Sequence, residues 1–237
     1  MLVDTDGGFI TQRQYPKLAQ LVVKQIKGGI ALQWPKHDWL NVSFPVRGIR
    51  KQVTVWRSSV NAAHIDGAIN TALSAWLGRS VTLAFMDESA ERFASPKWTN
   101  VPSQVSFADG YPILITNAAS LALLNNHIVN TGGEALGMDR FRPNIVIDCH
   151  KPWAEDGWKT LQIGEVTLDL VKPCARCIMT SIDQNTGGKH PKTALTALKK
   201  LHASTDPENP GVLFGWNAVV RKTGIVKIGE TVIPVSP

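Results

Sequence analysis

The sequence predicts a mixed α/β protein that is rich in β-strands, with a few helices packed on its sheets. Short strand-like runs separated by Asp-Gly, Gly-Gly and proline breaks fill the first part of the chain. Separate segments carry apolar residues at helical spacing. In the second half, two strand-like runs flank an Ile-Gly-Glu turn, as in a hairpin. Together these patterns favour an antiparallel sheet followed by a β-barrel with flanking helices.

The N-terminal elements follow from turn chemistry and periodicity. The expected strands cover residues 1–4, 9–14, 18–26, 30–34, 41–46 and 50–56. A helix is expected over 66–77, because Ile69, Leu73 and Leu77 share one face and Gly78 is placed to end it. Residues 81–86 then form another expected strand.

Residues 90–104 are irregular, with two prolines and charges of both signs, which predicts a connection between two lobes. Beyond it we expect strands over 111–117 and 143–149, a hairpin over 161–173, helices over 118–129 and 192–202, and strands over 217–224 and 224–235. The predicted domains are therefore 1–95 and 96–237.

Composition narrows the classes of function. The chain of 237 residues is 43% hydrophobic, as in ordinary globular proteins. It has no apolar run that could cross a bilayer, and its start lacks the layout of a signal peptide, so we expect a cytoplasmic protein without a membrane partner. The net charge of +6 favours anionic partners. Its basic residues are scattered, however, which disfavours nucleic acid as a partner.

The three cysteines are an odd number and too few for a disulfide scaffold, which favours a reducing compartment. Cys174 and Cys177 are spaced as Cys-x-x-Cys, a pattern of zinc sites and redox dithiols. A zinc site would need Cys149 and a histidine such as His150 or His190, in an order that no common zinc motif uses.

Three further interpretations of the pair stay open. A redox dithiol would sit at a helix N-terminus, whereas Pro173 precedes this pair and a strand-like run follows it. One thiolate could instead bind a soft transition metal while Arg176 meets an anion. Both cysteines could also be small buried hydrophobes.

The run from Arg140 to Gly187 resembles the core of the MOSC domain, a family named after the C-terminal part of molybdenum cofactor sulfurase. It is especially similar to the branch of the amidoxime-reducing components and their bacterial relatives. The motifs occur in the family's order and are Arg-Pro-Asn, Glu-Asp-x-Trp, Ile-Gly, Cys-x-Arg-Cys and Thr-x-x-Asp. Residues 2–21 resemble the family's N-terminal β-barrel domain, and residues 107–125 resemble the segment that opens the MOSC domain. The resemblance implies both of these domains.

The resemblance implies a molybdenum cofactor, held at named positions. Cys177 would be the molybdenum ligand and catalytic residue, with Cys174 a neighbour in the wall. Arg142 matches the family's phosphate-binding arginine, and Arg176 is a second candidate for that role. A thiolate suits the sulfur-rich coordination that the pterin dithiolene completes.

The resemblance assigns further residues to the pterin. Asn144 is placed to hydrogen-bond the cofactor or to fix its loop, and Asp109 and Gly110 match the loop that touches the pterin edge. Asp183 is interpreted as a turn residue, and His150 could line the substrate side. The resemblance also brings the family's description as binding pyridoxal phosphate. His37, His64, His127, His190 and His202 receive no role.

The implied activity is a molybdenum-cofactor-dependent oxidoreductase that reduces N-hydroxylated compounds, such as hydroxylamino bases and amidoximes, to amines. The implied partners are a small-molecule N-hydroxylated substrate and a separate electron-donor protein of the iron–sulfur or flavin type, because no cysteine motif follows Cys177. The alternative is a non-catalytic carrier of the cofactor or of sulfur, or a binding module with the MOSC fold. The chain also lacks the family's Tyr-Pro-x-Lys-Ser and Gly-Leu-x-x-Asp-Arg segments before Met1, so we expect it to be truncated at its N-terminus.

Overall fold

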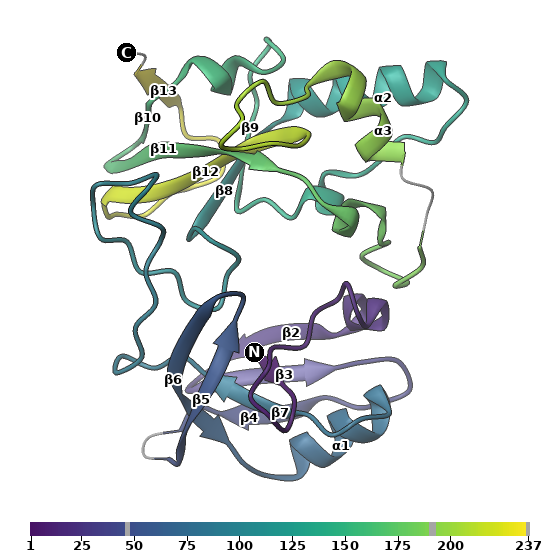
Figure 1. The fold of residues 1–237 in the computed structure, drawn as a ribbon, viewed down its shortest axis with the longest axis vertical. Coiled ribbons are helices and arrows are strands. Elements are labelled where there is room, and N and C mark those ends of the chain that lie inside the picture. Colours follow the sequence, from purple (N-terminus) through teal and green to yellow (C-terminus); the bar gives the residue numbers. More distant parts are fainter. Residues whose placement is uncertain (46–47, 190–192, 236–237) are drawn as a thin grey trace. The chain divides into compact units, whose positions relative to one another are not determined.

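The computed structural model describes residues 1–45, 48–189 and 193–235. Contacts divide the chain into two compact units (Figure 1). The first unit contains Met1–Arg92 and also Ile182–Lys189, and the second contains Phe93–Ser181 and the described residues from 193 onward. The boundary that the sequence predicts after residue 95 stays a prediction.

The first unit is built from two small antiparallel sheets and a helix. Its four-stranded sheet has the order β1 (Leu2–Val3), β7 (Thr82–Phe85), β6 (Ser58–Ile65) and β5 (Arg50–Val55). Its three-stranded sheet has the order β2 (Val22–Ile26), β3 (Gly29–Gln33) and β4 (Leu40–Ser43). Helix α1 (Ala68–Leu77) adds Ile69, Leu73 and Leu77 to a core that includes residues of both sheets. The helix ends as predicted, because Gly78 adopts the left-handed conformation at φ 72°.

The strand prediction for the first unit was wrong at two places and incomplete at a third. Residues 9–14 form a turn apart from one bridge at Phe9, since the amides of Gln14 and Tyr15 bond to the Thr11 carbonyl. The first part of 18–26 lies in a 3-10 helix, η1 (Pro16–Gln20), which starts at a proline whose φ suits a helix start. The long strand β6 was not predicted, because its small and polar residues carry little strand propensity.

The second unit is a curled six-stranded sheet that forms a half-barrel, as Figure 1 shows. Its strand order is β13 (Val232–Val235), β10 (Thr160–Ile163), β11 (Val166–Ala175), β12 (Leu213–Lys222), β8 (Ile113–Asn117) and β9 (Ile145–Ile147). All neighbours are antiparallel except β8 and β9. The hairpin of β10 and β11 confirms the sequence prediction, whereas only 232–235 of the expected last strand form β13.

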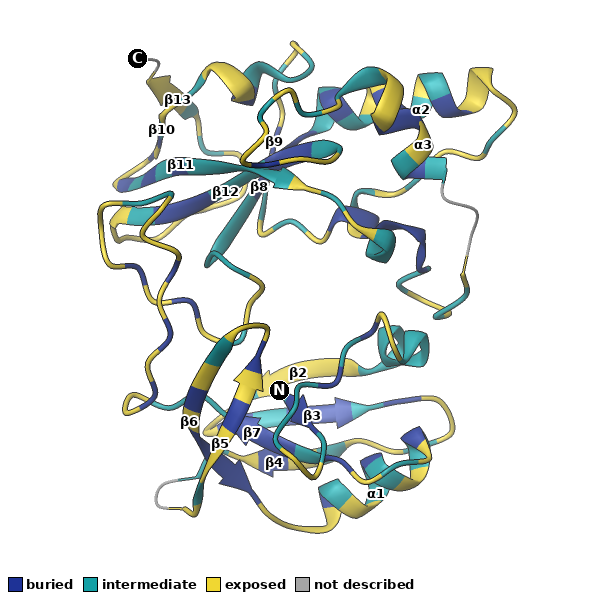
Figure 2. Ribbon diagram, in the orientation of Figure 1, coloured by how far each residue is buried: buried dark blue, intermediate teal, exposed yellow. Residues whose placement is uncertain are grey.

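Two helices pack with the sheet around an aromatic cluster. Helices α2 (Ala118–Asn130) and α3 (Thr193–Leu201) bury one face each, and Leu124, Ile128 and Leu198 are fully buried (Figure 2). The rings of Phe141 and Phe214 belong to the same buried cluster and are stacked with centres 3.9 Å apart. Three short 3-10 turns complete the unit and are η2 (Met138–Phe141), η3 (Ala154–Gly157) and η4 (Ile178–Ser181).

Strands β12 and β8 approach each other closely at Gly215. Its φ is 78°, and a Cβ atom there would lie 2.4 Å from the carbonyl oxygen of Ile115. Only glycine fits this position without displacing the backbone. In the described parts of the chain, no helix has both the length and the apolar character needed to cross a membrane.

Candidate functional site

The Cys174–Cys177 motif lies at the end of β11, one of the two ten-residue strands of the second unit. Strand β11 stops at Ala175 and η4 begins at Ile178, so Arg176 and Cys177 form the link between them. None of the three cysteines forms a disulfide, but their exposure differs. Cys177 is exposed, Cys174 is half-buried, and Cys149 packs against the sheet core. Cys177 is therefore the thiol of this motif that is most accessible to a ligand.

Arg176 is fixed beside these thiols by its guanidinium. One terminal nitrogen donates to Cys174 Sγ at 3.0 Å, and the other donates to the carbonyl oxygen of Phe141 at 2.8 Å. The guanidinium carbon also lies 5.5 Å from the centre of the Phe141 ring. Among the described residues its buried Nε has no hydrogen-bond partner. A buried cationic donor with an unused N–H fits the binding of an anionic group.

The main chain around Cys177 is held on both sides. The amide of Arg176 donates to the Val212 carbonyl at 2.8 Å, and Thr180 Oγ1 donates to the Cys177 carbonyl at 3.1 Å. The pairing of β11 with β12 shifts register between Pro173 and Ala175. Such an irregularity bends a strand and redirects its side chains.

Arg142 lies on the segment that contacts Arg176. It follows Phe141 directly, is exposed, and adopts a left-handed conformation at φ 54° at the end of η2. Because Arg176 donates to the Phe141 carbonyl, the structure brings the segments of the two predicted phosphate-binding arginines together. Their role toward phosphate stays a prediction.

The other predicted cofactor residues lie around β8 and β9. Asn144 Oδ1 accepts from the amide of Leu114 at 2.8 Å, and the Asn144 amide donates to the Leu114 carbonyl at 2.9 Å. This side chain therefore joins the start of β9 to β8, in line with the loop-fixing alternative. Asp109 is exposed and Gly110 half-buried in the loop that leads into β8, which β12 separates from β11.

The remaining candidates from the sequence are Asp183, His150 and His190. Asp183 Oδ1 accepts from Asn185 N and from both the amide and the hydroxyl of Thr186, which confirms a turn residue. His150 is exposed, and His190 lies outside the described residues. Within residues 1–45, 48–189 and 193–235, no three His, Cys, Asp or Glu side chains form a group that could hold a metal ion.

A buried carboxyl that sequence reasoning left without a role lies in the same unit. Glu155 is 1% exposed, and its two oxygens accept from Asn117 Nδ2 at 2.9 Å and from Ser120 Oγ at 3.2 Å. Burial raises the pKa of Glu155, and the two hydrogen bonds oppose this rise. No local signal marks it, because its partners Asn117 and Ser120 lie 38 and 35 residues away in the chain.

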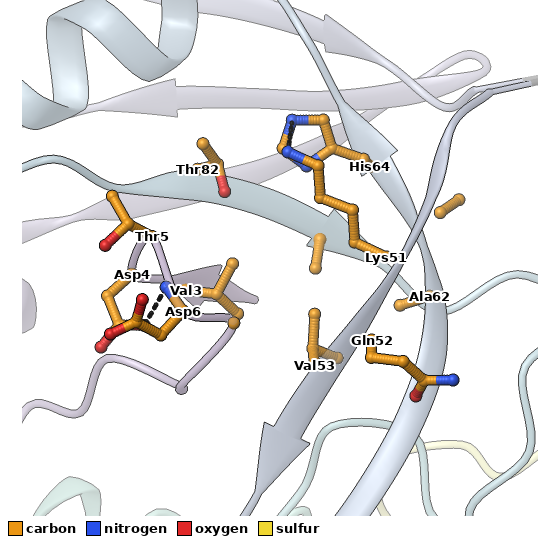
Figure 3. A pocket seen from close by; sticks show the side chains of 13 residues that line it. Val3, Asp4, Thr5, Asp6, Lys51, Gln52, Val53, Ala62, His64 and Thr82 are labelled. Atoms are coloured by element: carbon orange, nitrogen blue, oxygen red, sulfur yellow. Dashed lines mark hydrogen bonds between the residues drawn. The ribbon is translucent and has the colours of Figure 1, made fainter.

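A cavity of about 390 Å³ lies in the first unit, away from all predicted site residues in sequence. It is lined by residues of β5, β6 and β7 and by the turn from Asp4 to Gly7 (Figure 3). His64 is 7% exposed there, with Nε2 2.9 Å from Asp66 Oδ1 and 3.4 Å from Lys51 Nζ. Both contacts are made by Nε2, which can donate to Asp66 or accept from Lys51, so His64 is interpreted as a histidine with local partners.

Comparisons with known proteins match both halves of the chain. The family model described as MOSC domain matches residues 102–233, and the model described as MOSC N-terminal beta barrel domain matches residues 1–80. Mitochondrial amidoxime reducing component 2 of Bos taurus is 36% identical over 98% of this chain and 71% of its own length. Mitochondrial amidoxime-reducing component 1 of Danio rerio is 26% identical over 100% of this chain and 73% of its own length. Molybdenum cofactor sulfurase of Oryza sativa subsp. japonica is 26% identical over 84% of this chain and 27% of its own length.

Proposed function

Because this chain belongs to the MOSC domain family, we propose that it is a molybdenum-cofactor-dependent oxidoreductase that reduces N-hydroxylated compounds to amines. The single observation that carries the proposal is the arrangement at the end of β11. There an exposed thiol, Cys177, directly follows an arginine whose buried Nε has no partner among the described residues. The names of the amidoxime-reducing relatives support the substrate class.

The residues present fit such a cofactor. Cys177 would supply the thiolate ligand to molybdenum, because thiolates suit soft transition metals. Arg176 would direct its unused Nε–H, and Arg142 its exposed guanidinium, toward the cofactor phosphate. Asp109 and Gly110 would border the pterin. When bound, the cofactor supplies the transfer of an electron pair to the substrate.

The protein's own contribution is to hold this loop in place. Arg176 cannot swing away without losing its bonds to Cys174 and to Phe141. Thr180 fixes the carbonyl of Cys177 from the other side. The Cys177 thiol therefore lies on a loop that hydrogen bonds already hold in place. Less conformational entropy is then lost when a ligand binds to this loop.

The proposed reaction needs a small N-hydroxylated substrate and a separate electron donor. Cleavage of the N–O bond consumes two electrons and two protons, and it yields the amine or amidine and water. We propose that the electrons come from a separate iron–sulfur or flavin protein, since groups of these two kinds carry electrons in proteins.

A second candidate is a non-catalytic carrier of the cofactor or of its sulfur. It is favoured by the similarity to a molybdenum cofactor sulfurase, which covers 84% of this chain. An exposed cysteine beside an anion-binding arginine would serve such a carrier equally well.

The decisive experiment purifies the protein from a host that makes the cofactor. We expect molybdenum to approach one atom per chain, and benzamidoxime to be reduced to benzamidine when a chemical reductant replaces the donor protein. Molybdenum without turnover would support the carrier. Absence of both molybdenum and turnover would overturn the oxidoreductase and the cofactor carrier.

A further inference from the structure

His202 lies at the meeting point of three segments of the second unit. It follows the last residue of α3, and its Nε2 is 2.7 Å from Asp156 Oδ2 in η3. Its Nδ1 is 3.0 Å from the carbonyl oxygen of Leu213, the first residue of β12. The ring of Trp153 stacks on the imidazole with centres 4.1 Å apart. The imidazole is therefore held at both nitrogens and against an aromatic ring.

The two partners of this ring are both acceptors. A neutral imidazole has one N–H and can satisfy only one of them, whereas an imidazolium donates to both. Burial is the largest single influence and lowers the pKa of His202, but the hydrogen bond and charge of Asp156, the Leu213 carbonyl and the charge of Glu155 together raise it more. The pKa therefore lies above the ordinary histidine value, in agreement with the geometry.

The charges around His202 come from two elements. Asp156 and Glu155 of η3 are acidic, and Asp156 Oδ1 is fixed by Trp216 Nε1 at 2.8 Å. Lys199 and Lys200 in the last turn of α3 are exposed. The residues that β12 brings near, Leu213 and Trp216, are uncharged. The carboxylates thus dominate the surroundings of the ring.

Main-chain bonds connect His202 to the cysteine loop. The amide of Leu213 donates to the His202 carbonyl at 2.9 Å, and the amide of Ser204 donates to the Gly211 carbonyl at 2.8 Å. On the other side, the Val212 carbonyl accepts from the amide of Arg176 at 2.8 Å, and Leu213 is the register partner of Ala175. Residues 211–213 therefore lie between the His202 segment and the residues that precede Cys177.

We propose that His202 is a positioning residue for Cys177. In its protonated form it fixes Val212 and Leu213, which hold the main chain of Arg176 and so set the direction of the Cys177 thiol. When the imidazole loses a proton, His202 keeps only one of its two hydrogen bonds. Residues 212 and 213 are then held less firmly. The inference rests on the proposed function only for the task of Cys177, because the contacts themselves need no cofactor.

The test follows the amide of Arg176 by hydrogen exchange in the ¹⁵N-labelled full chain without molybdenum. Protection, corrected for the intrinsic pH dependence of exchange, is expected to fall about tenfold as the pH rises through the titration of His202. The titration is read from the imidazole C–H signal in the same sample. Protection that stays constant while His202 loses its proton would overturn the proposal.

Three variants sharpen this result. His202→Arg keeps a charge and several donors at all pH values, so protection should stay high and independent of pH. His202→Gln is neutral and should give low protection throughout. His127→Gln, in α2 of the same unit, is the matched control and should behave like the wild type. If the Arg176 amide is protected equally in His202→Gln and in the wild type, the positioning role is refuted. If His202→Gln does not fold, the pH dependence of protection in the wild type is compared with that in His202→Arg instead.

The rate at which iodoacetamide alkylates Cys177 gives a second readout, followed by peptide mass spectrometry. The ratio of the wild-type rate to the His202→Arg rate should change with pH through the same titration, because thiolate formation affects both proteins alike. A constant ratio would contradict the proposal. Since both measurements use metal-free protein, their failure is separate from a failure of the molybdenum and turnover experiment.

Discussion

The guanidinium of Arg176 donates to the main-chain carbonyl of Phe141 at 2.8 Å, which joins the cysteine loop to the end of η2. The same guanidinium donates to Cys174, so one side chain braces a thiol and a neighbouring turn. This bracing requires two separate donor nitrogens in one plane, which the guanidinium of arginine offers and the single ammonium of lysine does not.

Arg176→Lys should therefore weaken cofactor retention more than its unchanged charge suggests. A lysine has a single ammonium and cannot reach Cys174, Phe141 and an anion together. We expect molybdenum content after gel filtration to fall about tenfold. Arg221→Lys is the matched control, because Arg221 pairs with Asp169 on an exposed part of the same sheet. Equal losses in the two variants would argue against a special role for Arg176.

The two cysteines of the motif should respond differently to the same substitution. Cys177→Ser removes the proposed metal ligand and should reduce amidoxime turnover more than about 100-fold, with an unchanged melting temperature because Cys177 is exposed. Cys174→Ser keeps an acceptor for Arg176 and should retain most turnover. Turnover assays on both variants, at matched molybdenum content where it can be reached, check this. Full activity of Cys177→Ser would rule out its ligand role.

Glu155 should make the free energy of unfolding depend on pH. Its pKa is raised above the ordinary value of 4.5, so its contribution to stability is present below that value and is lost as the pH rises through the raised pKa. Glu155→Gln carries no titrating proton and should flatten this part of the profile. Urea unfolding over a pH series measures it, and identical slopes for wild type and variant would contradict the prediction.

Removing the Glu155 side chain should lower the free energy of unfolding more than neutralising it does. Glu155→Ala leaves the buried groups of Asn117 and Ser120 without their acceptor, which should lower the free energy of unfolding by about 1–3 kcal/mol at neutral pH. A loss within experimental error would mean that the structure relaxes around the missing group.

Gly215 should not tolerate a methyl group. Gly215→Ala places Cβ against the Ile115 carbonyl at a residue with φ 78°, so we expect a loss of roughly 1–3 kcal/mol in thermal or urea unfolding. Gly157→Ala serves as the control, because a Cβ there meets no atom within 4 Å. Similar stabilities for the two variants would show that β12 and β8 can separate locally at little cost.

Local signals in the sequence were sufficient where an element depends on its own residues. The expected helix over 66–77 forms as Ala68–Leu77, because its apolar face and Gly78 are both local features. Strand β6 was missed for the opposite reason. Its small residues, such as Ala62 and Ala63, become buried strand positions only through pairing with β5 and β7 on either side.

The same contrast applies to the candidate site. Cys177 and Arg176 could be singled out because their motif is contiguous. His202 received no role from its sequence position, since its charged partner Asp156 lies 46 residues away in the chain and reaches it only in the fold. A network assembled by tertiary pairing leaves no spacing pattern for a reader of the sequence to find.

The eight residues Ile182–Lys189 limit where this protein can be divided for experiments. They follow the cysteine loop in sequence but belong to the first unit, where Gln184 accepts from Gln12 Nε2 at 3.2 Å. Gly187 lies so close to Pro16 that a Cβ atom would come within 2.7 Å of the Pro16 carbonyl oxygen. The first unit is thus discontinuous in the chain. A cut between the two family-model matches would separate this unit from one of its own pieces, so functional studies of the cysteine loop are best done on the uncut chain.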